Sequence, residues 1–188
     1  MKKKYNNLVI SCDGGAASGK TTGAKLISKK YNLKFLSSGL LYRYVAYLLL
    51  KTKTKNKMFF LRNKFKNLDY TKLNKINLHT PEISEYSAVI AKNKDIRKIL
   101  KNYQIKFSKK FKNCCIEGRD ISTKILPNSD LKFYFVCNIN TAALRRYREL
   151  KKTLKKIKLK DVKQALRKRN KLDKQRKISP LLKHRNSI

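Results

Sequence analysis

Residues 14–21 read Gly-Gly-Ala-Ala-Ser-Gly-Lys-Thr, and this stretch decides the fold. It matches the pattern G-x-x-x-x-G-K-[ST] at every fixed position, in a chain of 188 residues with only six glycines. A short apolar run, Leu8 to Cys12, precedes the match, and apolar residues at helical spacing, such as Ala24 and Ile27, follow it. Strand, glycine-rich loop and helix in this order predict a phosphate-binding loop, in which backbone N–H groups and a helix N-terminus converge on one anionic site.

Side chains of this loop have predicted roles at a nucleoside triphosphate. The Lys20 ammonium is placed to bridge the β- and γ-phosphates, and the Thr21 hydroxyl is placed to ligate Mg²⁺. Glu117, an acid at the end of a later strand candidate, is a second expected contact for the metal and its water shell. The predicted ATP site comprises Gly14, Gly15, Ala16, Ala17, Ser18, Gly19, Lys20, Thr21 and Thr22.

The rest of the chain alternates strand and helix patterns. Further strand candidates are Phe35-Leu36, Cys114 to Ile116 and Leu131 to Cys137. Helical spacing of apolar residues marks residues 39–50, 81–92, 96–111, 141–150 and 161–177. Residues 51–77 are rich in Lys and Asn, and there we expect loops and a weak hairpin. The alternation predicts an α/β domain with a parallel sheet of about four or five strands flanked by helices.

The composition is strongly basic. The formal net charge is +38, and 38 of the 49 basic residues are lysines spread along the chain. Such a chain can bind nucleic acid through counterion release, but dispersed lysines favour a solvated surface, and no zinc spacing or RNP-type aromatic motif supports nucleic-acid binding. No run approaches the roughly 18 apolar residues of a membrane span, and no signal-peptide core follows Met1. We expect a monomeric cytoplasmic protein without a membrane or nucleic-acid partner.

The arginines are more informative than the lysines, because a guanidinium fork suits bidentate phosphate recognition. An acceptor that is itself a phosphate has an ionised nucleophilic oxygen and needs no strong general base, which fits a sequence with two His and 11 acidic residues. A sugar alcohol or a shikimate-type acceptor would need a carboxylate base, and Asp13, directly before the loop, is the candidate. Both alternatives stay open at this point.

Five segments share the order and spacing of one family's motifs. They are Asp13-Gly14 with the loop, Ser37-Ser38-Gly39-Leu40-Leu41-Tyr42-Arg43, Arg97 with Gln104, Glu117-Gly118-Arg119-Asp120, and Arg169 to Pro180-Leu181 with Asp173 and Arg176 between them. In this order they are similar to D-G-x-x-x-S/A-G-K, D-[ST]-G-A-[LI]-Y-R, V-R-x-x-L-x-x-x-Q, D-G-R-D and R-D-x-x-D-x-x-R-x-x-x-P-L. From about Leu8 to the C-terminus, the chain therefore resembles bacterial cytidylate kinase, a P-loop nucleoside monophosphate kinase.

The resemblance implies phosphoryl transfer from ATP to CMP or dCMP with Mg²⁺. It implies a P-loop NTPase-type core at residues 1–50 and 113–188, a helical CMP-binding insertion at 51–112 and a short lid at about 151–160. Asp120 would read the cytosine amino edge, and Asp173 with Arg169 would hold the ribose hydroxyls and the acceptor phosphate. The implied catalytic residues are Lys20, Asp13, Arg119, Arg145 and Arg148. The implied acceptor-binding residues are Ser38, Gly39, Tyr42, Arg43, Arg97, Arg119, Asp120, Arg169, Asp173 and Arg176, and the implied metal contacts are Thr21 and Glu117.

Several positions depart from the family's motifs. Ser37 stands in place of an Asp, Ser122 in place of a Gly, Ala88 in place of a base-contacting Ser, and Asn170 in place of the second acid of an R-D pair. Family members also continue beyond the Pro-Leu pair through another strand and helix, so a truncated C-terminus stays an open alternative. A P-loop kinase of UMP, shikimate or dephospho-coenzyme A, and a basic nucleic-acid-binding protein, are the rival functions.

Overall fold

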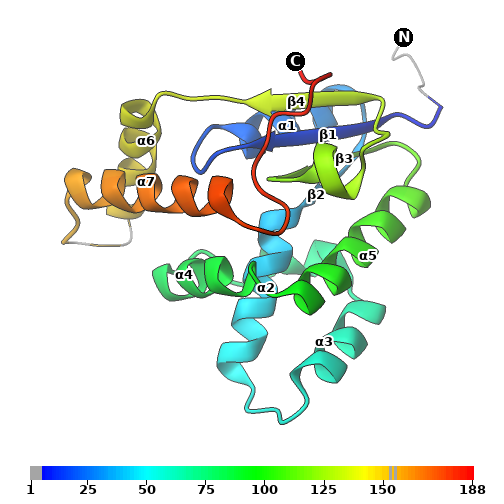
Figure 1. Cartoon of the computed structure of the whole chain (residues 1–188), viewed down its shortest axis with the longest axis horizontal. Helices are drawn as coiled ribbons and strands as arrows, with labels where there is room; N and C mark the ends of the chain where they lie inside the picture. The colour runs from blue at the N-terminus through cyan, green and yellow to red at the C-terminus, as the bar shows by residue number, and fades with distance from the viewer. Residues whose placement is uncertain (1–5, 153, 155) are drawn as a thin grey trace.

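A parallel sheet forms the centre of the protein in the computed structural model, which describes residues 6–152, 154 and 156–188 (Figure 1). Its strands are β1 (Val9–Gly14), β2 (Lys34–Ser37), β3 (Cys114–Gly118) and β4 (Leu131–Phe135), in the order β2-β3-β1-β4. Strand β1 pairs with both β3 and β4, so that Ile10 lies opposite Cys115 on one side and Leu131 on the other. The predicted α/β fold is confirmed, and the strand order places the loop after β1 at the middle of the sheet's carboxyl edge, where parallel sheets bind ligands.

Side chains alternate along the strands between two apolar layers. Ile10 and Cys115 belong to one cluster together with Ala24 of α1 (Lys20–Lys30). Ile116 belongs to the other cluster together with Val45 of α2 (Ser38–Lys51). Because β1 and β3 are covered on both faces, each begins with an apolar run, Val9-Ile10 in β1 and Cys114 to Ile116 in β3, and these runs could be recognised without the structure.

The chain between α2 and β3 is helical. It contains α3 (Lys57–Lys66), the 3₁₀ helix η1 (Tyr70–Lys75), α4 (Pro81–Ile90) and α5 (Lys94–Lys110), which lie together on one side of the sheet (Figure 1). The expectation of loops and a hairpin at residues 51–77 is wrong, because α3 and η1 occupy most of this stretch. Helix α3 buries Leu61 and Phe65, one turn apart, and Asn56 caps it by accepting a hydrogen bond from the Phe59 N–H at 3.0 Å.

A third apolar cluster joins the phosphate loop to the last two helices. After the π-helical turn η2 (Ile121–Ile125) and β4, the chain forms α6 (Ile139–Lys151) and α7 (Leu159–Gln175). Ala16 of the loop packs with Ala142 and Ala143 of α6 and with Val162 and Leu166 of α7. The expected lid at 151–160 falls where α6 ends and α7 begins, and its residues Thr153 and Lys155 lie outside the described residues.

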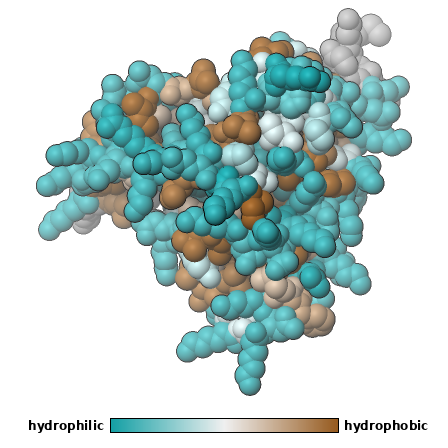
Figure 2. All heavy atoms as spheres, viewed as in Figure 1, coloured by the Kyte–Doolittle hydropathy of each residue, from teal (hydrophilic) through white to brown (hydrophobic). Residues whose placement is uncertain are grey.

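The last segment returns to the sheet. The Ile188 N–H donates to Lys132 O at 3.0 Å, and the Tyr134 N–H donates to Ile188 O at 2.9 Å, so the final residue pairs with the outer edge of β4. Figure 2 shows hydrophilic side chains spread over most of the visible surface rather than gathered in one patch. Within the part of the chain that the structure describes, no helix has the length and apolar character needed to cross a membrane.

Candidate active site

The loop between β1 and α1 folds so tightly that two of its glycines have no room or no favourable conformation for a side chain. A Cβ on Gly14 would lie 2.5 Å from the carbonyl oxygen of Phe135. Gly19 precedes α1 in the left-handed conformation, with φ of 86°, and Ala17 also has a positive φ of 55°. This backbone path leads directly into the N-terminus of α1, whose unpaired N–H groups and dipole favour an anion.

A cavity of about 680 Å³ lies in front of the loop. Side chains from α1, α2, the insertion, β3, α6 and α7 surround it, and most of them are polar or basic. The lining residues are Ala16, Ala17, Ser18, Gly19, Lys20, Thr21, Thr22, Gly23, Lys25, Phe35, Ser37, Gly39, Leu40, Arg43, Asn74, His79, Glu117, Arg119, Arg145, Arg146, Glu149, Leu166 and Arg169.

Lys20 and Glu117 form the floor of this cavity. The Lys20 ammonium donates to Gly15 O at 3.2 Å and lies 3.9 Å from Glu117 Oε2. Burial and the positive charge of Arg119 lower the pKa of Lys20 to about 7, although Glu117 acts in the opposite direction. Ser37 Oγ donates to Glu117 Oε1, whereas the buried Glu117 Oε2 has no hydrogen-bond partner among the described residues. The floor therefore offers a poorly compensated cation and a free carboxylate oxygen side by side.

Arginines from several elements face the same space. Arg43 of α2, Arg119 after β3, Arg145 of α6 and Arg169 of α7 all line the cavity. Burial, followed by the charges of neighbouring arginines, lowers the pKa of Arg43 to about 10, and burial followed by the charge of Arg119 does the same for Arg169. These arginines repel one another, and the repulsion contributes to the lowered pKa of Arg43 and Arg169. A bound polyphosphate would stabilise the cluster, because the anion relieves the repulsion and accepts hydrogen bonds from the guanidinium groups.

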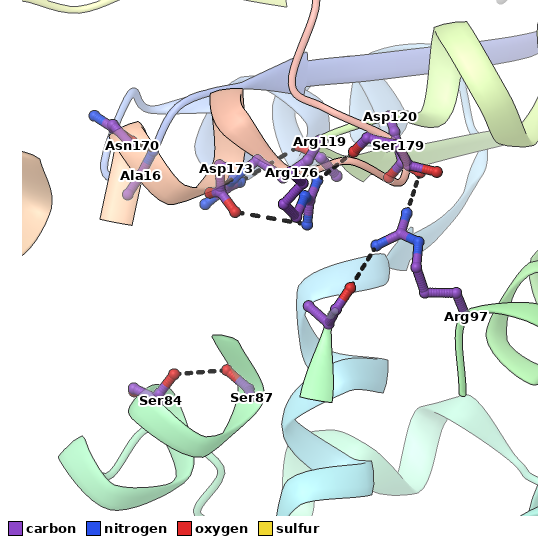
Figure 3. A network of polar contacts seen from close by, with 12 residues as sticks. Ala16, Ser84, Ser87, Arg97, Arg119, Asp120, Asn170, Asp173, Arg176 and Ser179 are labelled. Atoms are coloured by element: carbon purple, nitrogen blue, oxygen red, sulfur yellow. Dashed lines mark hydrogen bonds and ion pairs between the residues drawn. The ribbon is translucent and has the colours of Figure 1, made fainter. Parts of the chain in front are cut away.

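A network of ion pairs lies directly beside the cavity (Figure 3). Arg119 Nε donates to Asp173 Oδ2 at 2.8 Å, and Arg176 lies 3.6 Å from Asp173 Oδ1. Burial acts to raise the pKa of Asp173, but the charge and hydrogen bond of Arg119, with the charge of Arg176, outweigh it and hold that pKa below its usual value. A second buried pair joins Arg97 to Asp120. Because Arg119 belongs to both the cavity and this network, the two form one continuous site.

Asp13 is occupied by backbone contacts. Its Oδ1 accepts a hydrogen bond from the Ile121 N–H at 2.8 Å, and its Oδ2 accepts one from the Ser122 N–H at 2.7 Å and one from the Ser122 hydroxyl at 2.6 Å. The side chain is fully buried, and burial raises its pKa even though the three hydrogen bonds act in the opposite direction. Asp13 is therefore engaged in fixing the turn that carries Arg119 and Asp120, and it does not line the cavity.

The predicted residues are distributed between cavity and network as follows. Ala16 to Thr22 line the cavity, while Gly14 and Gly15 form the backbone behind them. Four of the acceptor-binding candidates line the cavity: Gly39, Arg43, Arg119 and Arg169. Four others belong to the adjacent network: Arg97, Asp120, Asp173 and Arg176. Ser38 is buried close to Gly118. The Arg97 guanidinium lies over the ring of Tyr42, with its central carbon 5.7 Å from the centroid of that ring. Arg145 lines the cavity, whereas Arg148 is exposed and is not among the described lining residues.

Several residues of the site were missed by sequence reasoning. Asn74 and His79 reach the cavity from the helical segment between α2 and β3, and Arg146 and Glu149 reach it from α6. Ser84 of α4 accepts a hydrogen bond from Arg43 at 2.6 Å. A signal existed for Arg146, which stands inside an arginine-rich run. The others lie in segments whose path through space no local pattern indicates.

Comparison with protein families and relatives supports one assignment. The family model of cytidylate kinase matches residues 10–188. A cytidylate kinase of Bartonella tribocorum is 40% identical over 178 residues, which cover 92% of this chain and 81% of that protein. Cytidylate kinases of Clostridium tetani and Fusobacterium nucleatum are 31% and 33% identical, and the matches cover 96% and 97% of this chain and 84% and 88% of those proteins.

A solved structure of an uncharacterized protein from Eubacterium ventriosum has the same fold, with a TM-score of 0.52 at 19% identity over 89% of this chain and 76% of that one. The phosphate loop, the arginine-lined cavity and the sequence matches agree, and the chain belongs to the cytidylate kinase family.

Proposed function

We propose that the chain transfers the γ-phosphoryl group of ATP to CMP or dCMP, giving ADP and the corresponding diphosphate. The observation that carries the proposal is the double use of Arg119, which lines the phosphate-loop cavity and also holds Asp173 at 2.8 Å in the adjacent network. One guanidinium thus lies between a site built for a triphosphate and a second set of charged groups. That is the arrangement a transfer between two phosphorylated ligands needs.

In this proposal the protein contributes positioning and charge rather than a base. The acceptor's phosphate oxygen is ionised at neutral pH, and Arg43, Arg119 and Arg169 hold it in line with the γ-phosphate. Lys20 and Arg145 stabilise the negative charge that spreads over the transferred group. Asp13 acts as a positioning residue, because its three hydrogen bonds occupy both carboxylate oxygens.

The residues beside the loop fit a Mg²⁺ ion carried by the triphosphate. Glu117 Oε2 is a buried carboxylate oxygen without a hydrogen-bond partner among the described residues, and Thr21 lines the same cavity. The described ranges contain no group of three or more His, Cys, Asp or Glu that could hold a metal ion. Thr21 and Glu117 would hold the ion and its water shell, and the ion would supply positive charge that neutralises the polyphosphate.

The acceptor nucleotide is proposed to bind between the ion-pair network and the insertion at 51–112. Asp120, which is buried and paired with Arg97, is proposed to accept a hydrogen bond from an exocyclic amino group, which cytosine has and uracil lacks. Asp173 with Arg169 is proposed to hold the ribose hydroxyls and the acceptor phosphate, and Arg176 supports Asp173 through their ion pair at 3.6 Å. The Arg43 guanidinium spans from the cavity to α4 through Ser84, so acceptor binding would act on both the core and the insertion.

The test is a coupled ADP-release assay with ATP and Mg²⁺ on the purified chain, run separately with CMP, dCMP, UMP, AMP and shikimate. We expect turnover with CMP or dCMP, and loss of that turnover in Lys20→Ala. Turnover with UMP, AMP or shikimate instead would keep the kinase and overturn the acceptor. No turnover with any acceptor, in a chain shown to be folded by circular dichroism, would overturn the proposed activity.

A further inference from the structure

Asn170 contacts the phosphate loop from outside the cavity. Its Oδ1 accepts a hydrogen bond from the backbone N–H of Ala16 at 2.8 Å (Figure 3). A Cβ placed on Gly15 would lie 3.2 Å from the same oxygen and 3.5 Å from Asn170 Nδ2. The amide therefore lies against two consecutive residues in the first half of the loop, and Gly15 leaves the space that it needs.

Helix α7 contributes both apolar and polar contacts to the first half of the loop, next to the alanines of α6. Ala16 packs against Val162 and Leu166 of that helix, and the amide of Asn170, one turn beyond Leu166, adds the polar contact. The N–H of Ala16 is thereby directed to a side chain instead of to a phosphate. This hydrogen bond ties the loop to α7, whereas the residues from Ala17 to Thr22 continue along the cavity.

The same helix carries residues of the acceptor side. Arg169, the neighbour of Asn170, lines the cavity, and Asp173, three residues on, holds Arg119 at 2.8 Å. Helix α7 therefore contacts the donor loop through Asn170 and the acceptor network through Asp173. The contact of Asn170 with the donor loop is therefore separate from the contact of Asp173 with the acceptor network.

We propose that Asn170 is a positioning residue for the donor phosphates, which fixes the curvature of the loop through Ala16 and sets its distance from α7. The part of this inference that concerns the acceptor rests on the proposed function, whereas the part that concerns the donor loop does not. The hydrogen bond needs only an acceptor oxygen at this position. A carboxylate in place of the amide offers the same oxygen, whereas a methyl group does not.

Three variants separate positioning from general stability. Asn170→Ala removes the hydrogen bond, Asn170→Asp keeps it, and Gln164→Ala removes an exposed amide from the same helix as a matched control. The readouts are the dissociation constant of a fluorescent ADP in the presence of Mg²⁺, the KM values for ATP and CMP, and the thermal unfolding midpoint.

Loss of one neutral hydrogen bond that shapes the loop is expected to weaken ADP binding in Asn170→Ala by roughly three- to tenfold. The KM for ATP should rise by a similar factor, and the KM for CMP by less than about twofold. Asn170→Asp and Gln164→Ala should bind ADP within about twofold of the parent chain.

The proposal is overturned if Asn170→Ala binds ADP as tightly as Gln164→Ala does. It is also overturned if Asn170→Asp is as defective as Asn170→Ala, or if the weaker ADP binding is accompanied by an equal loss of CMP affinity and a lower unfolding midpoint, because each result would indicate a general structural role. If the parent chain binds ADP but does not phosphorylate CMP, the proposed acceptor fails, and the ADP comparison still decides the role of Asn170.

Discussion

Replacing Asp13 separates a structural carboxylate from a catalytic one. In Asp13→Ala, the backbone N–H groups of Ile121 and Ser122 lose their acceptor in a fully buried place. An unsatisfied buried donor costs about 1–3 kcal/mol, so two of them should lower the free energy of unfolding by about 2–6 kcal/mol. Ser122→Ala alone should cost about 0.5–3 kcal/mol, as the loss of one hydrogen bond to the buried Asp13 carboxyl group.

Asp13→Asn is the decisive variant. The amide has the shape of the carboxyl group, but its N–H₂ group would face a donor, the N–H of Ile121 or of Ser122, where the carboxyl group has an oxygen. We expect a loss of about 1–3 kcal/mol, measured by urea unfolding followed by far-ultraviolet circular dichroism. Under conditions where the variant is folded, its turnover with CMP should stay within about tenfold of the parent's. An Asp13→Asn protein with the stability of the parent but with turnover reduced by about a thousandfold or more would refute this reasoning and establish Asp13 as a general base.

Other perturbations test the remaining parts of the site. Since burial and Arg119 lower the pKa of Lys20 to about 7, the free protein holds this amine mostly neutral at pH 8 and mostly charged at pH 6. ADP binding should therefore take up close to one proton at pH 8 and little at pH 6, and calorimetry in two buffers should show that Lys20→Met loses this uptake. Gly23→Ala would place a Cβ in the Phe135 ring and should cost about 1–3 kcal/mol in urea unfolding, a cost that should vanish in a Phe135→Ala background. Arg97→Ala leaves the buried Asp120 unpaired and should cost about 3–5 kcal/mol, whereas the double variant with Asp120→Ala should lose less than the two single losses combined.

The sequence was sufficient for those parts of the fold that depend on local patterns. β1, the loop and α1 follow from an apolar run, glycines at fixed spacing and helical periodicity, all within about 20 residues. The stretch at 51–77 was mistaken because lysines and asparagines surround the buried Leu61 and Phe65 of α3, and only this pair and the Asn56 cap indicated a helix. With a net charge of +38, a high density of lysines does not exclude a helix in this chain.

For the site, sequence motifs predicted which residues come together but not what each one does. The same sequence is compatible with Asp13 as a general base and with Asp13 as a backbone anchor. The contacts with Ile121 and Ser122, which favour the anchor, are visible only in the structure. The pairing of Arg119 with Asp173 joins residues 54 positions apart, and no spacing rule specifies it. Asn170 stood out as a departure from an acidic motif position, yet its contact with Ala16 could be found only in three dimensions.

The contact of α7 with the phosphate loop has a consequence for folding. Asn170 and Ala16 are 154 positions apart, so their contact closes a loop that includes most of the chain. Contacts of such separation carry a large loop-closure entropy and tend to form late. During synthesis the sheet and the insertion can assemble while α7 is still inside the ribosome, but the nucleotide site cannot be completed until that helix has emerged. Bound nucleotide would then stabilise only chains that have finished folding. The nucleotide concentration would therefore affect the docking of α7, the last folding step, and not the earlier assembly of the sheet.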